Sequence, residues 1–292
     1  MQKFKIFDRN TRRPNPLPPL KSCDSQFHIF GPTEKYPIRP GAVYHTPEAT
    51  MAEVRRMHKA IGFERGVIVQ NTAYATNSRP LLDALAEAGP NYRGCAVIDE
   101  SVDDAELERI NTAGVGGARF NFNKRLNLVP SEGSFLHALA RMEKIGWYAK
   151  INATAGDIVE REALLKTLKL NVVIDHLGGL PGPDAGVRRE AQRVIKDLLQ
   201  RGNWWVMLSN GDRRSQIGYP FDDAVAVAQD FIAWAPERMI WGSDWPHPLV
   251  TEDMEMKNDG DLVELLYRYA PSDATRQKIL VDNPAKLFGF GD

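Results

Sequence analysis

Eight short apolar runs recur along the chain, and amphipathic stretches of helical periodicity separate them. Runs that are apolar throughout, rather than at alternate positions, are typical of strands buried on both faces in a parallel sheet. Eight such strands, each followed by a helix, predict the α/β class and a single closed (β/α)8 barrel rather than an open sheet. The runs are residues 23–30, 65–70, 92–98, 115–122, 147–152, 171–176, 204–209 and 238–244.

Two of the separating stretches show how the helices are expected to begin and end. In residues 46–62, Thr46 is the predicted N-cap of a helix with an apolar stripe. In residues 101–114, Ser101 is the predicted cap and Gly114 the predicted stop.

The length of 292 residues suits one barrel domain with a large core. Residues 1–20 are rich in Pro, Arg and Asn and lack periodicity. They predict an irregular N-terminal arm that lies over the body or is frayed from it. The predicted barrel domain comprises residues 21–292.

Charge and cysteine usage exclude several function classes. The formal charge is -1 and its signs are mixed, which argues against nucleic acid or an anionic membrane as a partner. Cys23 and Cys95 lie in apolar runs without Cys-x-x-Cys spacing, as expected for buried free thiols in a reducing compartment. No segment approaches the roughly 20 apolar residues of a membrane helix, and no apolar leader is present. We expect a soluble cytoplasmic protein, and the sequence leaves a homo-oligomer open.

Polar residues stand at the C-terminal ends of the predicted strands. In a barrel these ends face the mouth, where active sites lie. The residues are Gln26, His28, Gln70, Arg119, Asn121, Asn152, Asp175, His176, Ser209, Asn210 and Asp244. Taken singly, His28 and His176 are each typical of a core histidine whose ring nitrogens are hydrogen-bonded. Only their combination with Asp244 at the strand ends favours a functional role. Asp175 points away from His176 along the strand, so we predict that it is structural and holds a loop or a helix end.

Several motifs together resemble the amidohydrolase superfamily: DSQFH at 24–28, GARFNFNKRL, VVIDHLGG, IWGSDWPHP and VDNPAKLFG. More narrowly, about residues 21 to 289 resemble the branch that contains 2-pyrone-4,6-dicarboxylate lactonases and D-galactarolactone isomerases, and the isomerases most of all. The resemblance implies an amidohydrolase-type barrel and isomerisation of D-galactaro-1,5-lactone to the 1,4-lactone, in D-galacturonate breakdown and without cofactor. Two alternatives remain: a lactone hydrolase of this branch, of the pyrone-dicarboxylate or muconolactone type, and a non-catalytic protein that binds a sugar acid.

Gln26 stands where metal-dependent members of the superfamily place an imidazole ligand, and Asn152 replaces another. An amide is a poor ligand for Zn²⁺, and the guanidinium of Arg119 would oppose the charge of a dication. The resemblance therefore implies a site without metal. A weak three-ligand site is the alternative, and its residues would be His28, His176 and Asp244.

The predicted catalytic residues are Asp244, His176 and His28. Asp244 is expected to act as a general base on the 4-hydroxyl of the substrate, which then attacks the lactone carbonyl. His28, His176 or Arg119 would donate hydrogen bonds to the oxyanion that forms.

Arginines above the mouth predict an anionic, dicarboxylic small substrate, because a guanidinium binds a carboxylate bidentately. Arg214 is the alternative to Arg213 for this role. The alternative for Arg125 is a solvated charge in a loop. For His247, contact with substrate and support of the loop are both open. The predicted substrate-binding residues are Gln26, Tyr44, Gln70, Thr72, Arg119, Arg125, Asn152, Arg213 and His247.

Overall fold

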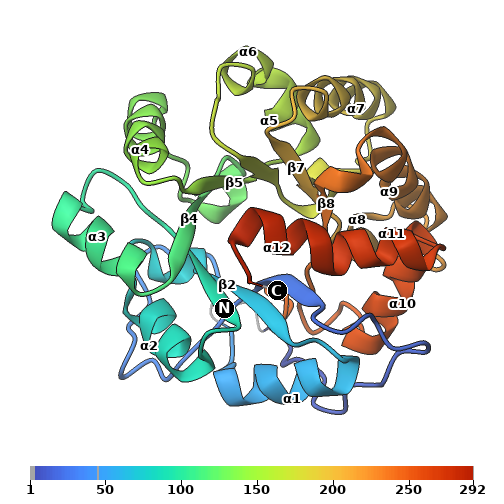
Figure 1. Ribbon diagram of the computed structural model, residues 1–292, viewed down its shortest axis with the longest axis horizontal. Helices are drawn as coiled ribbons and strands as arrows, with labels where there is room; N and C mark the ends of the chain where they lie inside the picture. The colour runs from blue at the N-terminus through green and yellow to red at the C-terminus, as the bar shows by residue number, and fades with distance from the viewer. Residues whose placement is uncertain (1–3, 45, 292) are drawn as a thin grey trace.

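Eight parallel strands follow one another in chain order around a barrel in the computed structural model, which describes residues 4–44 and 46–291 (Figure 1). The strands are β1 (Cys23–Phe27), β2 (Arg65–Val69), β3 (Tyr92–Ala96), β4 (Val115–Asn121), β5 (Tyr148–Asn152), β6 (Val172–Ile174), β7 (Trp204–Met207) and β8 (Met239–Ile240). Backbone hydrogen bonds close the ring between its ends, from Ser25 to Trp241 and from Asp244 to Gln26, both at 2.9 Å. The predicted single (β/α)8 barrel is confirmed.

Helices surround the barrel (Figure 1). The α-helices are α1 (Met51–Ile61), α2 (Arg79–Ala88), α3 (Asp104–Thr112), α4 (Glu132–Lys144), α5 (Ala155–Glu160), α6 (Glu162–Leu165), α7 (Ala185–Leu199), α8 (Gly211–Arg214), α9 (Asp222–Trp234), α10 (Asp259–Tyr269), α11 (Asp273–Gln277) and α12 (Asn283–Phe288). The shorter 3-10 and π turns are η1 (Thr72–Tyr74), η2 (Lys124–Leu126), η3 (His176–Gly179), η4 (Pro236–Arg238) and η5 (Lys278–Asp282).

The predicted caps of α1 and α3 were wrong by a few residues. Thr50, not Thr46, caps α1 in a capping box, because Ala49 just before it is held in a backbone bridge to Phe30. Asp103, not Ser101, caps α3, and the hydroxyl of Ser101 instead donates to Asp99 at 2.5 Å. The helix ends at Thr112, two residues before the predicted stop.

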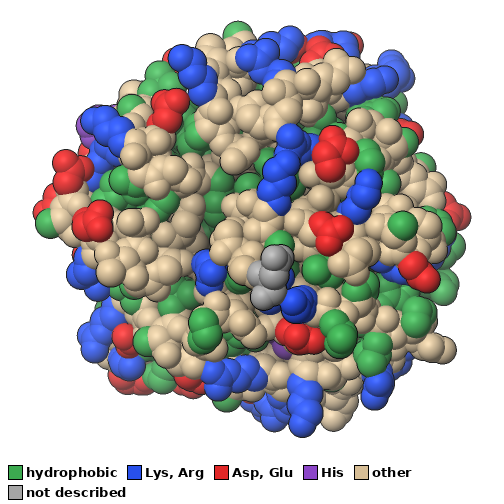
Figure 2. Space-filling model, in the orientation of Figure 1, with side chains coloured by type: hydrophobic (Ala, Val, Ile, Leu, Met, Phe, Trp, Pro, Cys, Tyr) green, Lys and Arg blue, Asp and Glu red, His purple; other side chains and the backbone are tan. Residues whose placement is uncertain are grey.

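Apolar side chains fill two separate spaces, one inside the barrel and one between the strands and the helices. Trp205 and Met207 belong to the inner cluster, which plugs the barrel below its mouth. At the N-terminal end Phe288 of α12 packs edge-on against Tyr148, with ring centroids 5.2 Å apart. On the face where α12 crosses the barrel, cationic and anionic side chains are interspersed (Figure 2). Cys23 and Cys95 are both free thiols and both buried, as predicted.

Residues 4–20 run over the body without a helix. Arg12 pairs with Asp261 of α10 at 2.5 Å, and Arg9 pairs with Glu53 of α1 at 2.9 Å. The arm is therefore irregular in structure but lies on the barrel, and its separation as a unit at residue 20 stays a prediction. His45 lies outside the described residues. Across the described ranges, no helix has the length and apolar run that crossing a membrane requires.

Candidate active site

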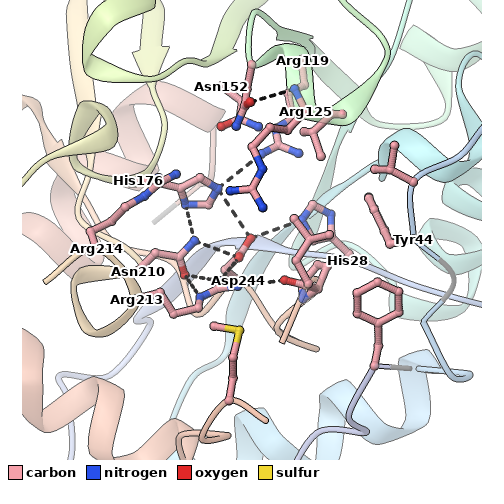
Figure 3. Close-up of a pocket in the computed structure, with 17 residues that line it drawn as sticks. His28, Tyr44, Arg119, Arg125, Asn152, His176, Asn210, Arg213, Arg214 and Asp244 are labelled. Carbon is pink, nitrogen blue, oxygen red and sulfur yellow. Dashed lines mark hydrogen bonds and ion pairs between the residues drawn. The ribbon is translucent and has the colours of Figure 1, made fainter. Parts of the chain in front are cut away.

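A cavity of about 360 Å³ opens at the C-terminal mouth of the barrel (Figure 3). A volume of this size suits a small-molecule ligand. Its polar lining residues are His28, Tyr44, Arg119, Asn123, Arg125, Asn152, His176, Asn210, Arg213, Arg214 and Asp244, and its apolar ones are Phe4, Val43, Leu126, Pro248, Leu249 and Met254. One carboxylate therefore faces four guanidinium groups.

Three polar lining residues leave their strands in the left-handed backbone region. The φ angles are 51° at His176 after β6, 61° at Asn210 after β7 and 58° at Asp244 after β8. This region costs a residue with a Cβ atom energy and persists only where surrounding contacts hold it. Such positions cluster at functional sites, and here all three point toward the same cavity (Figure 3).

Asp244 is held by a ring of hydrogen-bond donors. The Gln26 amide donates to Oδ1 at 2.8 Å, and the Asn210 amide donates to Oδ2 at 3.0 Å. The guanidinium of Arg213 pairs with Oδ2, and Nε2 of His28 lies 3.3 Å from Oδ1. The carboxylate is thus fixed in position with its negative charge matched by cationic and polar groups.

These partners decide the charge of Asp244. Burial by itself would raise the pKa of the carboxyl, but the guanidinium of Arg213, together with the amide donors around the carboxylate, outweighs burial and holds the pKa well below its ordinary value. Asp244 is therefore ionised across the neutral pH range.

His176 is held as a neutral imidazole. Burial lowers its pKa to about 3, although Asp244 and Asp175 oppose this shift. Its Nε2 faces two donors, Gln26 Nε2 at 3.3 Å and Arg119 Nη2 at 3.4 Å, so this nitrogen acts as an acceptor. Nδ1 lies 2.8 Å from Ser209 Oγ and 2.9 Å from the Asn210 amide nitrogen, so both ring nitrogens are held by hydrogen bonds.

The ring of His28 is oriented by the backbone of the neighbouring strand. Its Nδ1 lies 2.6 Å from the carbonyl oxygen of Val69 in β2, so Nδ1 carries a hydrogen and donates it. This bond points Nε2 at Asp244. The two histidines therefore approach the carboxylate from different strands, and each turns its Nε2 toward Oδ1, at 3.3 Å for His28 and 3.9 Å for His176.

A buried ion triad lies beside the cavity. Asp175 accepts from Arg119 Nε at 2.8 Å and pairs with Nζ of Lys150, also at 2.8 Å, and all three residues are buried. Burial opposes ionisation of Asp175, but Lys150 and Arg119 prevail and lower its pKa. The prediction that Asp175 holds a loop or helix end was wrong, because the residue points into the barrel and fixes Arg119.

The arginines fall into two groups. Arg213 is bound to its surroundings: it donates to the carbonyl of Pro248 at 2.9 Å and to the side chains of Asn210 and Asp244. Among the residues that the structure describes, no hydrogen bond or ion pair engages the guanidinium groups of Arg125 and Arg214. Burial, and then the charge of Arg213, lower the pKa of Arg214. A ligand carboxylate would relieve both unpaired cations.

Eight of the predicted site residues line the cavity, and they are His28, Tyr44, Arg119, Arg125, Asn152, His176, Arg213 and Asp244. Four others do not. Gln26 lies below the cavity and binds Asp244, and the Gln70 amide bonds the carbonyls of Ala75 and Asn77 within its own loop. Neither side chain is among the residues that line the cavity.

Thr72 and His247 also support the site from outside the cavity. The hydroxyl of Thr72 lies 3.0 Å from that of Tyr44, which does line the cavity. His247 Nε2 lies 3.2 Å from Asp259 of α10, so the loop-supporting alternative holds for this histidine.

Sequence reasoning left out several lining residues. The sequence does point to two of them: Asn210 is one of the polar residues at the strand ends, and Arg214 is the alternative to Arg213. Asn123 follows β4 in the same motif as Arg119. The apolar rim, including Phe4 of the arm, carried no signal because nothing local shows that the arm reaches the mouth.

The donor set does not fit a divalent cation. The amide nitrogen of Gln26, a donor rather than a ligand, stands within hydrogen-bond distance of both Asp244 and His176. The guanidinium groups of Arg213 and Arg119 flank the same two side chains. Within residues 4–44 and 46–291, no three His, Cys, Asp or Glu side chains are arranged to hold a metal ion.

Comparison with known proteins agrees with this architecture. The chain is 33% identical over 288 residues to a 2-pyrone-4,6-dicarboxylate hydrolase of Comamonas testosteroni, covering 96% of this chain and 93% of the relative. It is 29% identical over 282 residues to a D-galactarolactone isomerase of Agrobacterium fabrum, covering 94% and 93%. An apo crystal structure of an Agrobacterium tumefaciens protein superimposes with a TM-score of 0.85 at 26% identity, covering 97% of this chain and 99% of the other.

The family model for amidohydrolases matches residues 23–290, which include the whole barrel and every catalytic candidate. The chain therefore belongs to the amidohydrolase family.

Proposed function

We propose that this protein is a lactone isomerase that converts D-galactaro-1,5-lactone to D-galactaro-1,4-lactone by intramolecular acyl transfer, within D-galacturonate breakdown. The observation that carries the proposal is the cavity in which one ionised carboxylate, Asp244, faces four arginines. This arrangement suits an anionic acyl substrate and a reaction that begins with transfer of a proton to a carboxylate. Similarity to the Agrobacterium fabrum isomerase supports the substrate.

Binding would use the unpaired cations. The free carboxylate of the lactone would pair with Arg214 or Arg125, since both line the cavity without a carboxylate partner among the described residues. Asn152 and Asn210 would bind the ring hydroxyls.

The reaction would start at the 4-hydroxyl of the substrate. Asp244 takes its proton as O4 attacks C1, because a carboxylate of low pKa accepts a proton only while the C–O bond forms. The oxyanion that develops on the carbonyl oxygen would be stabilised by Arg119, whose position Asp175 fixes. The C1–O5 bond then breaks, and O5 takes the proton back from Asp244. Proximity favours this internal attack over attack by free water.

A lactone hydrolase is the second candidate, and the similarity to the Comamonas testosteroni hydrolase favours it. In that reaction Asp244 would take its proton from water, and the product would be the open dicarboxylic acid. A non-catalytic sugar-acid binding protein is a third reading, which requires tight binding of the lactone without turnover.

The test is NMR of freshly prepared D-galactaro-1,5-lactone with the protein in ¹⁸O-enriched water, followed by mass spectrometry of the products. Unlabelled 1,4-lactone, formed faster than without protein, is the expected result. Labelled open-chain acid as the main product would replace the isomerase with the hydrolase. If neither product forms faster with the protein than without it, only the sugar-acid binding protein remains of the three candidates.

A further inference from the structure

The N-terminal arm reaches the mouth of the cavity at Phe4. Phe4 lines the cavity together with Leu249 and Met254, which belong to the segment that follows β8. An antiparallel bridge joins Phe4 to Thr251, and the backbone N–H of Lys5 donates to the carbonyl of Val250 at 2.9 Å. The arm thus adds a short strand-like edge to the loop that covers the site.

The arm is fixed at several points behind Phe4. Phe7 is 5% exposed and packs on Trp245, the residue after Asp244, with ring centroids 4.4 Å apart. Farther back, the ion pairs of Arg9 with α1 and of Arg12 with α10 hold the arm on the barrel. Phe4 therefore lines the cavity at the end of a segment, residues 5–12, that is anchored on Trp245, α1 and α10.

The part of the rim that the arm completes is apolar. Val43, Leu249 and Met254 line the cavity and are 38–43% exposed, and the ring of Phe4 stands edge-on to that of Tyr44, with centroids 6.5 Å apart. Asp244 lies deeper and is 4% exposed, whereas Arg125, which also lines the cavity, is exposed. The apolar part of the rim offers no hydrogen bonds to water, whereas the interior offers many to a bound lactone.

Isomerisation and hydrolysis compete for the same carbon atom. In either reaction an oxygen attacks C1 and the C1–O5 bond breaks, and the nucleophile is either O4 of the substrate or a water molecule. Asp244 would accept the proton in both cases. The outcome therefore depends on whether water reaches C1 during the reaction.

We propose that Phe4 determines reaction specificity by sealing the mouth of the cavity against water, so that the internal hydroxyl is the only nucleophile in reach. The inference rests on the proposed function. It gives the arm, which has no part in the barrel itself, a role in the choice between two products.

The test compares Phe4→Ala with the matched control Ile6→Ala in ¹⁸O-enriched water. Ile6 lies in the same arm, is 44% exposed and does not line the cavity. We expect Phe4→Ala to raise the ratio of labelled open-chain acid to unlabelled 1,4-lactone at least tenfold over wild type, after subtraction of the reaction without protein. Ile6→Ala should match wild type, and Phe4→Leu, which keeps an apolar side chain, should restore most of the wild-type ratio. Circular dichroism and thermal unfolding would show that each variant is folded.

Two results would overturn the inference. A wild-type ratio in Phe4→Ala, with or without a higher KM, would mean that Phe4 only packs on the substrate or has no role there. Labelled acid as the main wild-type product would refute the isomerase and the seal together, because the arm would be in place and water would still attack. If wild type and Phe4→Ala both produce mainly unlabelled 1,4-lactone, the proposed role of Phe4 fails while the proposed isomerase stands.

Discussion

At the scale of single residues, the site depends on how charges are paired. Asp244 has Arg213 as its cation, Asp175 has Lys150 and Arg119, and Arg125 and Arg214 are left for a ligand. Arg214 is half-buried and Arg125 is exposed, and neither guanidinium has a partner among the described residues, so we expect an anionic ligand to complete the site.

The first prediction concerns Asp244→Asn. The amide keeps the shape of the carboxylate but cannot accept the proton of the 4-hydroxyl, so we expect kcat to fall 10²- to 10⁴-fold, the usual contribution of a general base. Steady-state kinetics on the 1,5-lactone would measure the loss, with thermal unfolding as the check on folding. Full activity in this variant would remove Asp244 from the mechanism.

The second prediction separates two neighbouring arginines. Arg214→Met should raise KM about 10- to 100-fold with little change in kcat, since it removes a charged hydrogen bond to the substrate. Arg213→Met should act mainly on kcat, because Arg213 holds Asp244. Measuring both constants for both variants tests the assignment, and the opposite pattern would exchange the two roles.

At the scale of elements, the seam between β1 and β8 positions the carboxylate of Asp244. Asp24 lies on the far side of β1 from the cavity and accepts from the backbone N–H of Ser243 at 2.9 Å and from its hydroxyl at 2.5 Å. His58 of α1 lies 3.2 Å from the same carboxylate. This clamp holds the residue before Asp244, where the backbone turns into the left-handed region.

A third prediction tests the clamp by comparing Ser243→Ala with Ser25→Ala. Both serines are buried, but among the described residues the hydroxyl of Ser25 hydrogen-bonds only to the sulfur of Cys23, at 3.8 Å. We expect Ser243→Ala to lower kcat about tenfold with an unchanged KM, because a left-handed Asp costs roughly 1–3 kcal/mol and relaxes once its support is weakened. Ser25→Ala should behave as wild type. Equal kinetics for both variants would make the clamp purely structural.

At the scale of the whole molecule, the cost of burying the site appears as a dependence of stability on pH. The folded protein keeps His176 neutral down to about pH 3, whereas in the unfolded chain a histidine is protonated below about pH 6.5. Between these values the unfolded state binds more protons, so the free energy of unfolding falls as the pH falls.

The fourth prediction follows from this difference. From pH 7 to pH 5, wild type should lose about 2 kcal/mol more of its free energy of unfolding than His176→Asn, which has no imidazole to protonate at that position. Urea unfolding at both pH values measures the two losses. Equal losses would show that His176 is already protonated in the folded protein.

The fifth prediction concerns metal. Because the Gln26 amide and two guanidinium groups surround the ligand positions, we expect EDTA to leave kcat unchanged and purified protein to contain much less than one metal ion per chain. Elemental analysis and chelator-treated assays provide the measurement. Activity that returns only with added Zn²⁺ would refute this account of Gln26.

The sequence predicted most of the site because barrel strands deliver their C-terminal residues to one place. The motifs around His28, Arg119, His176 and Asp244 lie at strand ends, so recognising the strands was enough to bring them together. Gln70 was misjudged because it also ends a strand but turns into its own loop. Asp175 was misjudged because β6 ends one residue before it and the left-handed turn begins at His176.

The amino-acid sequence by itself determined the eight-stranded barrel, the mouth as the site and the set of charged residues, since periodicity and strand order are local properties. Only the tertiary structure decided which charges pair, that the Gln26 amide donates to Asp244, and that Phe4 reaches the cavity. These depend on distances between segments far apart in the chain, which local patterns do not encode.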